Sequence, residues 1–142
     1  MKFFVDANIL VATINGEYPL YHYTARILGL ADQKGFQIYT TPVCLAIAFY
    51  FAEKRYGTAS AKKRLHTLSL HVDIAATTEE TVHSAFADPA VLDLEDGLEY
   101  FAALKAGCTC IVTEDKNDFH FSKIEVLSAA EFVERYILAH RF

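Results

Sequence analysis

Lys2-Phe3-Phe4-Val5-Asp6 is a short apolar, β-prone run that ends on a carboxylate. Residues 8–14 continue with a weaker helical pattern, which Asn15-Gly16 ends. The same order of strand and then helix recurs along the whole chain. Such alternation predicts a three-layer α/β/α fold, in which right-handed crossovers build a central parallel sheet that helices cover on both faces. We expect one domain over residues 1–142, because this length fits a single domain.

The remaining elements follow from apolar spacing, caps and glycine stops. Further strands are expected at residues 36–39, 71–74, 110–113 and 124–127. Helices are expected at residues 19–34, 43–56, 60–68 and 77–87, from residue 93 or 94 to 106, and after the capping box Ser128-x-x-Glu131. Residues 114–122 are expected to form a polar loop.

Composition excludes several classes of protein. The apolar stretches are broken before the roughly 20 residues that a membrane span needs, so no membrane segment is expected. Asp6 and Asn8 interrupt the apolar start, so no export signal is expected. Cys44, Cys108 and Cys110 match neither a zinc spacing nor a CxxC motif, and we expect core thiols in a cytoplasmic protein.

The formal net charge of −5 argues against nucleic-acid binding by overall basicity. Two local basic clusters remain, and they lie on consecutive predicted helices. They are ordinary solvated faces or, if the protein binds RNA, its backbone contacts. The residues are Lys54, Arg55, Lys62, Lys63 and Arg64.

Carboxylates from three segments converge in the predicted fold. Asp6 and Asp115 each follow a strand, so both belong at the carboxyl edge of the sheet. Asp93 and Asp96 begin a helix that runs back from the same edge, and Glu99 shares a helix face with Asp96. Gathered carboxylates repel one another unless a cation neutralises them.

Oxygen ligands without a His or Cys partner favour Mg²⁺ or Mn²⁺ at such a site. The chemistry this supports is hydrolysis of a nucleic-acid backbone. Each acid also has a purely structural interpretation. Asp6 and Asp93 can be helix N-caps, and Asp115 and Asp118 can be solvated loop residues. Their convergence favours the metal site.

At these residues the sequence resembles the PIN-domain ribonucleases, in particular the toxins of VapBC-type toxin–antitoxin pairs. The matching motifs span nearly the whole chain. They are Phe4-Val5-Asp6-Ala7-Asn8-Ile9-Leu10, Leu94-Glu95-Asp96-Gly97-Leu98 and Ile111-Val112-Thr113-Glu114-Asp115-x-x-Asp118-Phe119.

The resemblance implies a parallel sheet of about five strands and a ribonuclease that uses Mg²⁺ or Mn²⁺. It also implies an RNA substrate, a homodimer and an antitoxin partner that blocks the acidic pocket. Asp6, Asp96 and Asp115 would be metal-site carboxylates, and Asp118 an additional ligand. The supporting residues would be Asn8, Thr113, Asp93 and Glu99, of which Asn8 and Thr113 orient the acids.

One position departs from the family pattern. The family carries a glutamate on the helix after the second strand, where this chain has Ile47. Glu53 is turned about 120° away from that position and is a poor substitute, whereas Glu99 can compensate in part from a neighbouring helix. The departure leaves a second hypothesis open, in which the chain is a PIN-like binding module with impaired catalysis.

Other patterns carry less weight. The six histidines show no ligand spacing, and no phosphate-binding glycine motif is present. A phosphoacceptor receiver domain is disfavoured, because Ala75-Ala76 and Ser128 stand where its aspartate and lysine are needed. The aromatic run Phe49-Tyr50-Phe51 is expected to be core rather than a dimer or antitoxin face.

Overall fold

The computed structural model describes residues 1–139 and contains one parallel sheet. Its five strands pair in the order β3-β2-β1-β4-β5, so β1 lies in the centre. The sheet confirms the expected fold class. The strands are β1 (Lys2–Val5), β2 (Gln37–Thr40), β3 (Asp73–Ile74), β4 (Cys110–Val112) and β5 (Glu125–Leu127).

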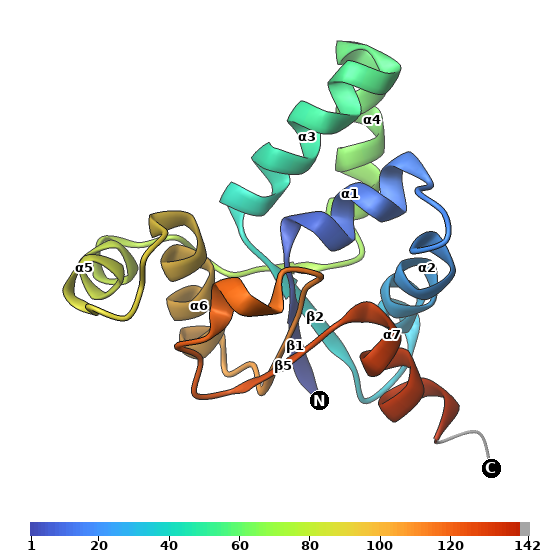
Figure 1. The fold of residues 1–142 in the computed structure, drawn as a ribbon. Coiled ribbons are helices and arrows are strands. Elements are labelled where there is room, and N and C mark those ends of the chain that lie inside the picture. Colours follow the sequence, from blue (N-terminus) through green and yellow to red (C-terminus); the bar gives the residue numbers. More distant parts are fainter. Residues whose placement is uncertain (140–142) are drawn as a thin grey trace.

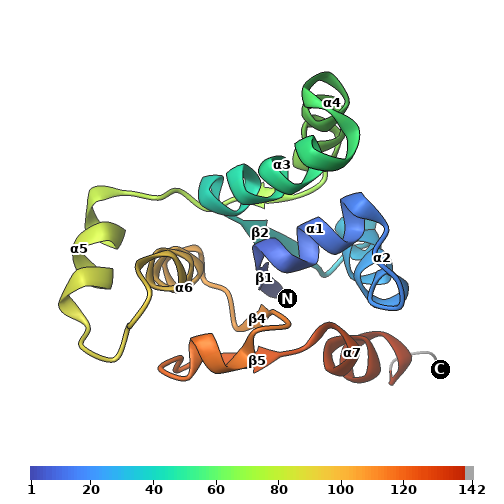
Figure 2. The same cartoon turned by 45° about the horizontal axis from the view of Figure 1, so that its top comes forward.

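Helices cover both faces of this sheet. Helices α5 and α6 lie on one side and α2 and α7 on the other, while the α3–α4 hairpin projects beyond the carboxyl edge (Figures 1 and 2). None of the helices within residues 1–139 combines the length and apolar character needed to cross a membrane. The α-helices are α1 (Ala7–Asn15), α2 (Tyr21–Gly29), α3 (Pro42–Tyr56), α4 (Thr58–Ser69), α5 (Glu79–Ala87), α6 (Leu94–Ala106) and α7 (Ala129–Phe132).

Caps place the helix starts where the sequence predicts them. The Thr41 hydroxyl accepts a hydrogen bond from the Cys44 amide, and Pro42 occupies the first turn of α3. Ser128 and Glu131 form the expected capping box at α7. The first turn of α3 is therefore fixed directly after β2, at the carboxyl edge of the sheet.

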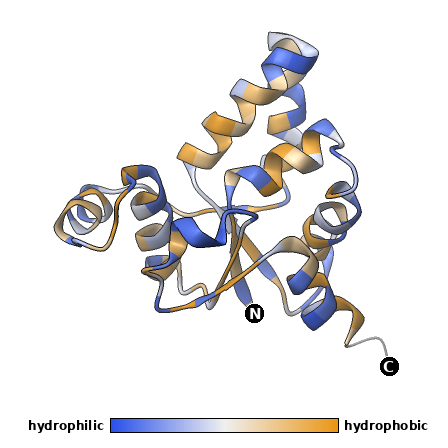
Figure 3. Ribbon diagram, viewed as in Figure 1, coloured by the Kyte–Doolittle hydropathy of each residue, from blue (hydrophilic) through white to orange (hydrophobic). Residues whose placement is uncertain are grey.

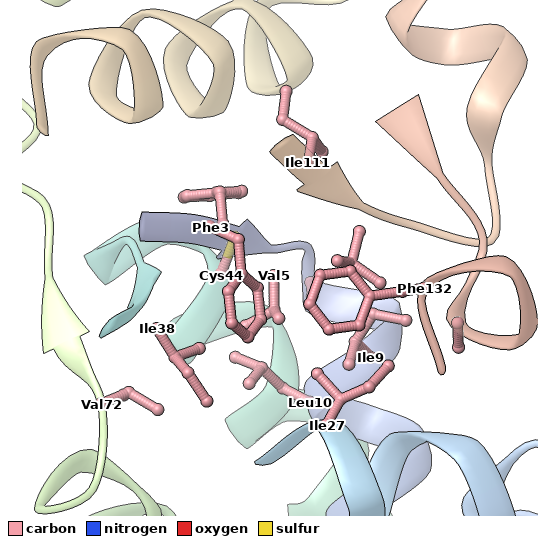
Figure 4. Packing of buried hydrophobic residues seen from close by; sticks show 14 of the residues in the cluster. Phe3, Val5, Ile9, Leu10, Ile27, Ile38, Cys44, Val72, Ile111 and Phe132 are labelled. Carbon is pink, nitrogen blue, oxygen red and sulfur yellow. The ribbon is translucent and has the colours of Figure 1, made fainter. Parts of the chain in front are cut away.

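The core is built on β1. Phe3, Phe4 and Val5 are all fully buried, as expected for the central strand of a sheet covered on both faces. The rings of Phe3 and Phe132 lie with centroids 4.5 Å apart, which joins β1 to α7 (Figure 4). Hydrophobic residues run through the strands and along much of α3 (Figure 3).

Three local expectations are wrong. The helix expected over residues 19–34 is shorter, because the chain tightens into the 3-10 turn η1 (Leu30–Asp32) after α2. The loop at residues 114–122 contains a second 3-10 turn, η2 (Lys116–Phe119), whose Phe119 is buried. Of the aromatic residues expected in the core, Phe49 packs against it, but Tyr50 and Phe51 are 52% and 44% exposed, because they face outward on the projecting part of α3.

Gly97 sets how closely α5 approaches α6. A Cβ at this position would lie 2.6 Å from Cγ1 of Val91 and 2.9 Å from Cβ of Ala85. Contacts this short do not occur between carbon atoms, and the Ala85 Cβ cannot move without its backbone. The close packing of α5 against α6 at Gly97 therefore requires a residue without a side chain.

We predict that Gly97→Ala lowers the free energy of unfolding by about 1–3 kcal/mol, because α5 must shift to admit the methyl group. Chemical denaturation of both proteins measures this loss. Gly29→Ala is the matched control: Gly29 ends α2 with nothing within 4 Å of its added Cβ, so the change should be neutral or stabilising. Equal stability of the two variants would contradict the prediction.

Candidate active site

The candidate site lies where the strand order reverses. The chain passes from β1 to β2 on one side, and β4 pairs with β1 on the other side. The loops after β1 and β4 diverge at such a point, which is where open parallel sheets bind ligands. Asp6 follows β1, and Thr113 to Asp115 follow β4.

Asp6 is held by several donors. It is the N-cap of α1, and its Oδ1 accepts a hydrogen bond from the Ala7 amide at 2.6 Å. Its Oδ2 accepts from the Thr113 hydroxyl at 2.8 Å and from Nδ2 of Asn8 at 3.4 Å. The residue is buried, with only 6% of its surface exposed. The carboxylate thus has a fixed orientation.

Asn8 connects Asp6 to Asp115. Its Nδ2 lies 3.1 Å from Oδ2 of Asp115 and 3.2 Å from the Thr113 hydroxyl, and its Oδ1 accepts from the Glu114 amide. The Asp115 amide donates to the Thr113 hydroxyl at 3.0 Å. The side chains of Asn8 and Thr113 thus link Asp6 to Asp115.

Helix α6 supplies further carboxylates from the other side. Asp93 caps the helix, accepting from the amides of Glu95 at 2.8 Å and Asp96 at 3.4 Å. One oxygen each of Glu95, Asp96 and Glu99 lies within 4.8 Å of the others. The predicted shared face of Asp96 and Glu99 is therefore present.

Glu99 occupies the middle of the site. Besides its place in the α6 group, it forms a second group with Asp6 and Cys44, whose ligand atoms also lie within 4.8 Å of one another. Glu99 is fully buried, and its Oε1 accepts a hydrogen bond from the Cys44 thiol at 2.6 Å. The sequence carries no signal for this role of Cys44, because a cysteine in a helix is most often a small apolar core residue.

Other predicted residues lie farther out. Asp115 and Asp118 are exposed and belong to neither close group, although the charge of Asp118 acts on Asp96. The basic clusters are on exposed positions of α3 and α4, and Lys54 lies ten residues beyond Cys44, about 15 Å along the helix. Lys63 and Arg64 line a cavity of about 610 Å³ between α1, α2 and α4.

The acids raise one another's pKa. Burial, followed by the charges of Asp93, Asp118 and Asp6, raises the pKa of Asp96 to about 7. Burial also raises the pKa of Glu99 well above its usual range, with further contributions from Cys44 and Asp6. Without a cation, the site therefore resists full ionisation.

The donor set fits a divalent cation. Carboxylate oxygens dominate it, and the ion pairs within residues 1–139 supply no basic partner to Asp6, Asp96 or Glu99. Oε2 of Glu99 is buried and accepts no hydrogen bond from the described part of the chain. Such a set suits Mg²⁺ or Mn²⁺, which bind carboxylates and retain water ligands.

We predict that the metal-free protein loses stability as the pH rises from about 4 to about 7. The folded state keeps the Asp96 proton up to a pKa of about 7, whereas the unfolded chain releases it at about 3.9, so a rise in pH across this window favours unfolding. Asp96→Asn should flatten this slope, measured as melting temperature against pH in EDTA. Asp73→Asn, at an exposed acid in β3, is the control; the same slope in Asp96→Asn and wild type would contradict the assignment.

Comparisons with known proteins identify the family of this chain and proteins of similar fold. Residues 2–117 match the family model of the PIN domain. The chain is 28% identical over 138 residues to Ribonuclease VapC1 of Aquifex aeolicus (strain VF5), covering 95% of each protein.

The fold is similar to that of VapBC2 from Rickettsia felis bound to a DNA fragment from their promoter (TM-score 0.69, 17% identity, 90% of this chain and 98% of that chain). It is also similar to Mycobacterium tuberculosis VapC20, a Sarcin-Ricin loop cleaving toxin (TM-score 0.65, 18% identity, 87% and 98%). The chain belongs to the PIN-domain family.

Proposed function

We propose that this protein is a metal-dependent endoribonuclease and the toxin of a type II toxin–antitoxin pair, acting in the cytoplasm. The observation that carries the proposal is the meeting of Asp6 and Asp96 with Glu99 at the switch point of the sheet. The curated relative over nearly the full length is a ribonuclease, which supports the same activity here. The three buried free cysteines suit a reducing compartment.

Each site residue has a role in this proposal. Asp6, Asp96 and Asp115 would hold Mg²⁺ or Mn²⁺, with Asp118 as an additional ligand at the exposed rim. A bound cation would lower the pKa of a water molecule coordinated to it and would neutralise negative charge on a phosphodiester. Asn8 and Thr113 orient Asp6 and Asp115 through the hydrogen bonds described above. Asp93 supports Asp96 by capping α6.

The exposed location of Asp115 suits contact with a substrate. Asp6 is buried, whereas Asp115 and Asp118 lie on the solvent side of the acids. A phosphate that approaches from solvent would meet these outer acids first, so charge neutralisation by a cation is needed before a polyanion can enter. This arrangement suits a hydrolase that acts on a long polymer, because such a substrate can contact the exposed rim of the site without entering the protein.

We predict that purified protein cuts RNA only with Mg²⁺ or Mn²⁺ and that Asp6→Asn or Asp96→Asn lowers the rate by about 100-fold or more. Loss of an outer-shell partner alone costs about 10- to 100-fold, so loss of a ligand should cost at least as much. Cleavage of a labelled RNA measures the rate, and EDTA gives the metal-free baseline. Asp73→Asn should cut like wild type; undiminished cleavage by the two site variants would rule out this site.

We further propose that the basic clusters bind the RNA backbone. The five side chains are exposed. Lys63 and Arg64 border a cavity that could admit an extended RNA strand. Because the basic clusters lie at a distance from the acids, they would bind a part of the RNA strand that is not being cleaved. Tyr50 and Tyr56, which lie under Lys54 and Arg64, hold these cations near the surface.

The triple variant Lys62→Ala/Lys63→Ala/Arg64→Ala is predicted to weaken RNA binding, because fewer phosphates are neutralised. The slope of log affinity against log salt should fall by about 0.7 for each phosphate that the variant no longer neutralises. Fluorescence anisotropy in EDTA measures binding without cleavage. Lys123→Ala removes an exposed charge from the loop that leads into β5, outside the residues that line this cavity, and should leave the slope unchanged. A triple variant with the wild-type slope would show that RNA does not bind at this cluster.

A second candidate function is a PIN-like binding module with lost catalysis. Ile47 favours it, because the residue is packed against the core where the family has a glutamate. This candidate predicts no Mn²⁺ binding by calorimetry to the wild-type chain, and a gain of binding in Ile47→Glu. Measurable Mn²⁺ binding together with RNA cleavage by the wild type would decide for the nuclease.

The proposal includes a homodimer and an antitoxin partner. Exposed Tyr50 and Phe51 on α3 suit a protein contact, because large aromatic side chains dominate such interfaces. Several proteins of similar fold are described as VapBC complexes, from Rickettsia felis and from Salmonella typhimurium. A small DNA-binding protein encoded in the adjacent reading frame is the partner we would expect.

A further inference from the structure

Glu99 is an ionisable side chain in an unusual position. It is 0% exposed, and of all buried side chains in the described chain it is the only glutamate. Burying a carboxylate without a cationic partner costs several kcal/mol. No ion pair within residues 1–139 includes Glu99, so the fold itself does not offset this cost.

The two oxygens of Glu99 have different surroundings. Oε1 accepts a hydrogen bond from the Cys44 thiol at 2.6 Å. Oε2 is buried and accepts no hydrogen bond from residues 1–139, and the neighbouring carboxylate of Asp6 can share a hydrogen bond with Glu99 only when one of the two acids is protonated. A buried oxygen that is left free is rare in folded proteins and indicates a missing partner, such as an ion.

The free oxygen belongs to a carboxylate that connects two groups of acids. Glu99 has an oxygen within 4.8 Å of an Asp6 oxygen, and it also has an oxygen within 4.8 Å of oxygens of Asp96 and Glu95. Among the described residues, Asp6 and Asp96 share no such group, and Glu99 is the one member that the two groups have in common. A cation between Asp6 and Asp96 would therefore have Glu99 as a neighbour.

We propose that Glu99 is a metal-binding carboxylate that, from α6, takes the place of the acid that α3 lacks at Ile47, and that Cys44 positions it. The thiol on the first turn of α3 holds Oε1 and leaves Oε2 for the ion. Helix α3 thus contributes a hydrogen-bond donor to the site instead of a ligand. This inference rests on the proposed function, because it assigns a residue to the same metal site.

The test measures Mn²⁺ binding by calorimetry to the full chain. Glu99→Gln keeps the size of the side chain and the acceptor for Cys44, so it should weaken Mn²⁺ binding at least about tenfold. Its melting temperature in EDTA should equal or exceed that of wild type, because a buried acid is replaced by a neutral amide. A purely structural Glu99 would instead give a lower melting temperature and unchanged Mn²⁺ affinity, which would overturn the proposal.

Further variants complete the test. Glu53→Gln, on α3 but outside both acid groups, is the matched control and should bind Mn²⁺ like wild type. Cys44→Ala should lower the affinity and Cys44→Ser should restore it, because serine keeps a donor; wild-type affinity in a folded Cys44→Ala would refute the positioning role. If Glu99→Gln does not fold, Glu99→Asp, which retracts the charge by one methylene, replaces it with the same expected loss.

The outcomes separate this inference from the proposed function. Wild-type protein that neither binds Mn²⁺ nor cuts RNA would refute both. Wild-type protein that binds Mn²⁺ and cuts RNA, together with a Glu99→Gln variant that binds equally well, would refute only the role of Glu99. Weak Mn²⁺ binding by Glu99→Gln, with binding retained by Glu53→Gln, supports the inference.

Discussion

The Thr113 hydroxyl donates to Oδ2 of Asp6 across 2.8 Å, and this hydrogen bond joins the ends of the two strands at the centre of the sheet. Thr113 also accepts from Asn8 and from the Asp115 amide, so one side chain links the loops after β1 and β4. Parallel pairing of β1 with β4 brings these loops to the same edge. The remaining acids are arranged around this connection, which is where we propose that a cation binds.

The site carries a cost in stability. Asp96 and Glu99 are shielded from water beside other acids, which raises their pKa values and disfavours the charged state of the folded protein. A core built on Phe3, Phe4 and Val5 offsets this cost, since each is fully buried. Functional sites commonly concentrate such unfavourable groups, because the ligand that relieves them is then bound more tightly.

The helices around the site can exchange roles without changing the fold. Helix α3 presents the Cys44 thiol where its first turn meets α6, and α6 presents Glu99 to the same space. A cation requires several oxygen ligands at suitable distances, and it makes no difference which helix supplies each of them. In the arrangement that we propose, Ile47 packs against the core and Glu99 of α6 contributes the charge instead.

The sequence by itself determined the local features of this protein. The strand at β1, the caps at Thr41 and Ser128, and the placement of Asp6 and Asp115 after their strands follow from short-range patterns, because hydrogen bonds and side-chain alternation act within a few residues. Only the tertiary structure decided which acids lie deepest. Glu99 meets Cys44 because the rotation and approach of α6 depend on long-range packing, including the contact of Gly97 with Ala85, and no local pattern encodes such a packing distance.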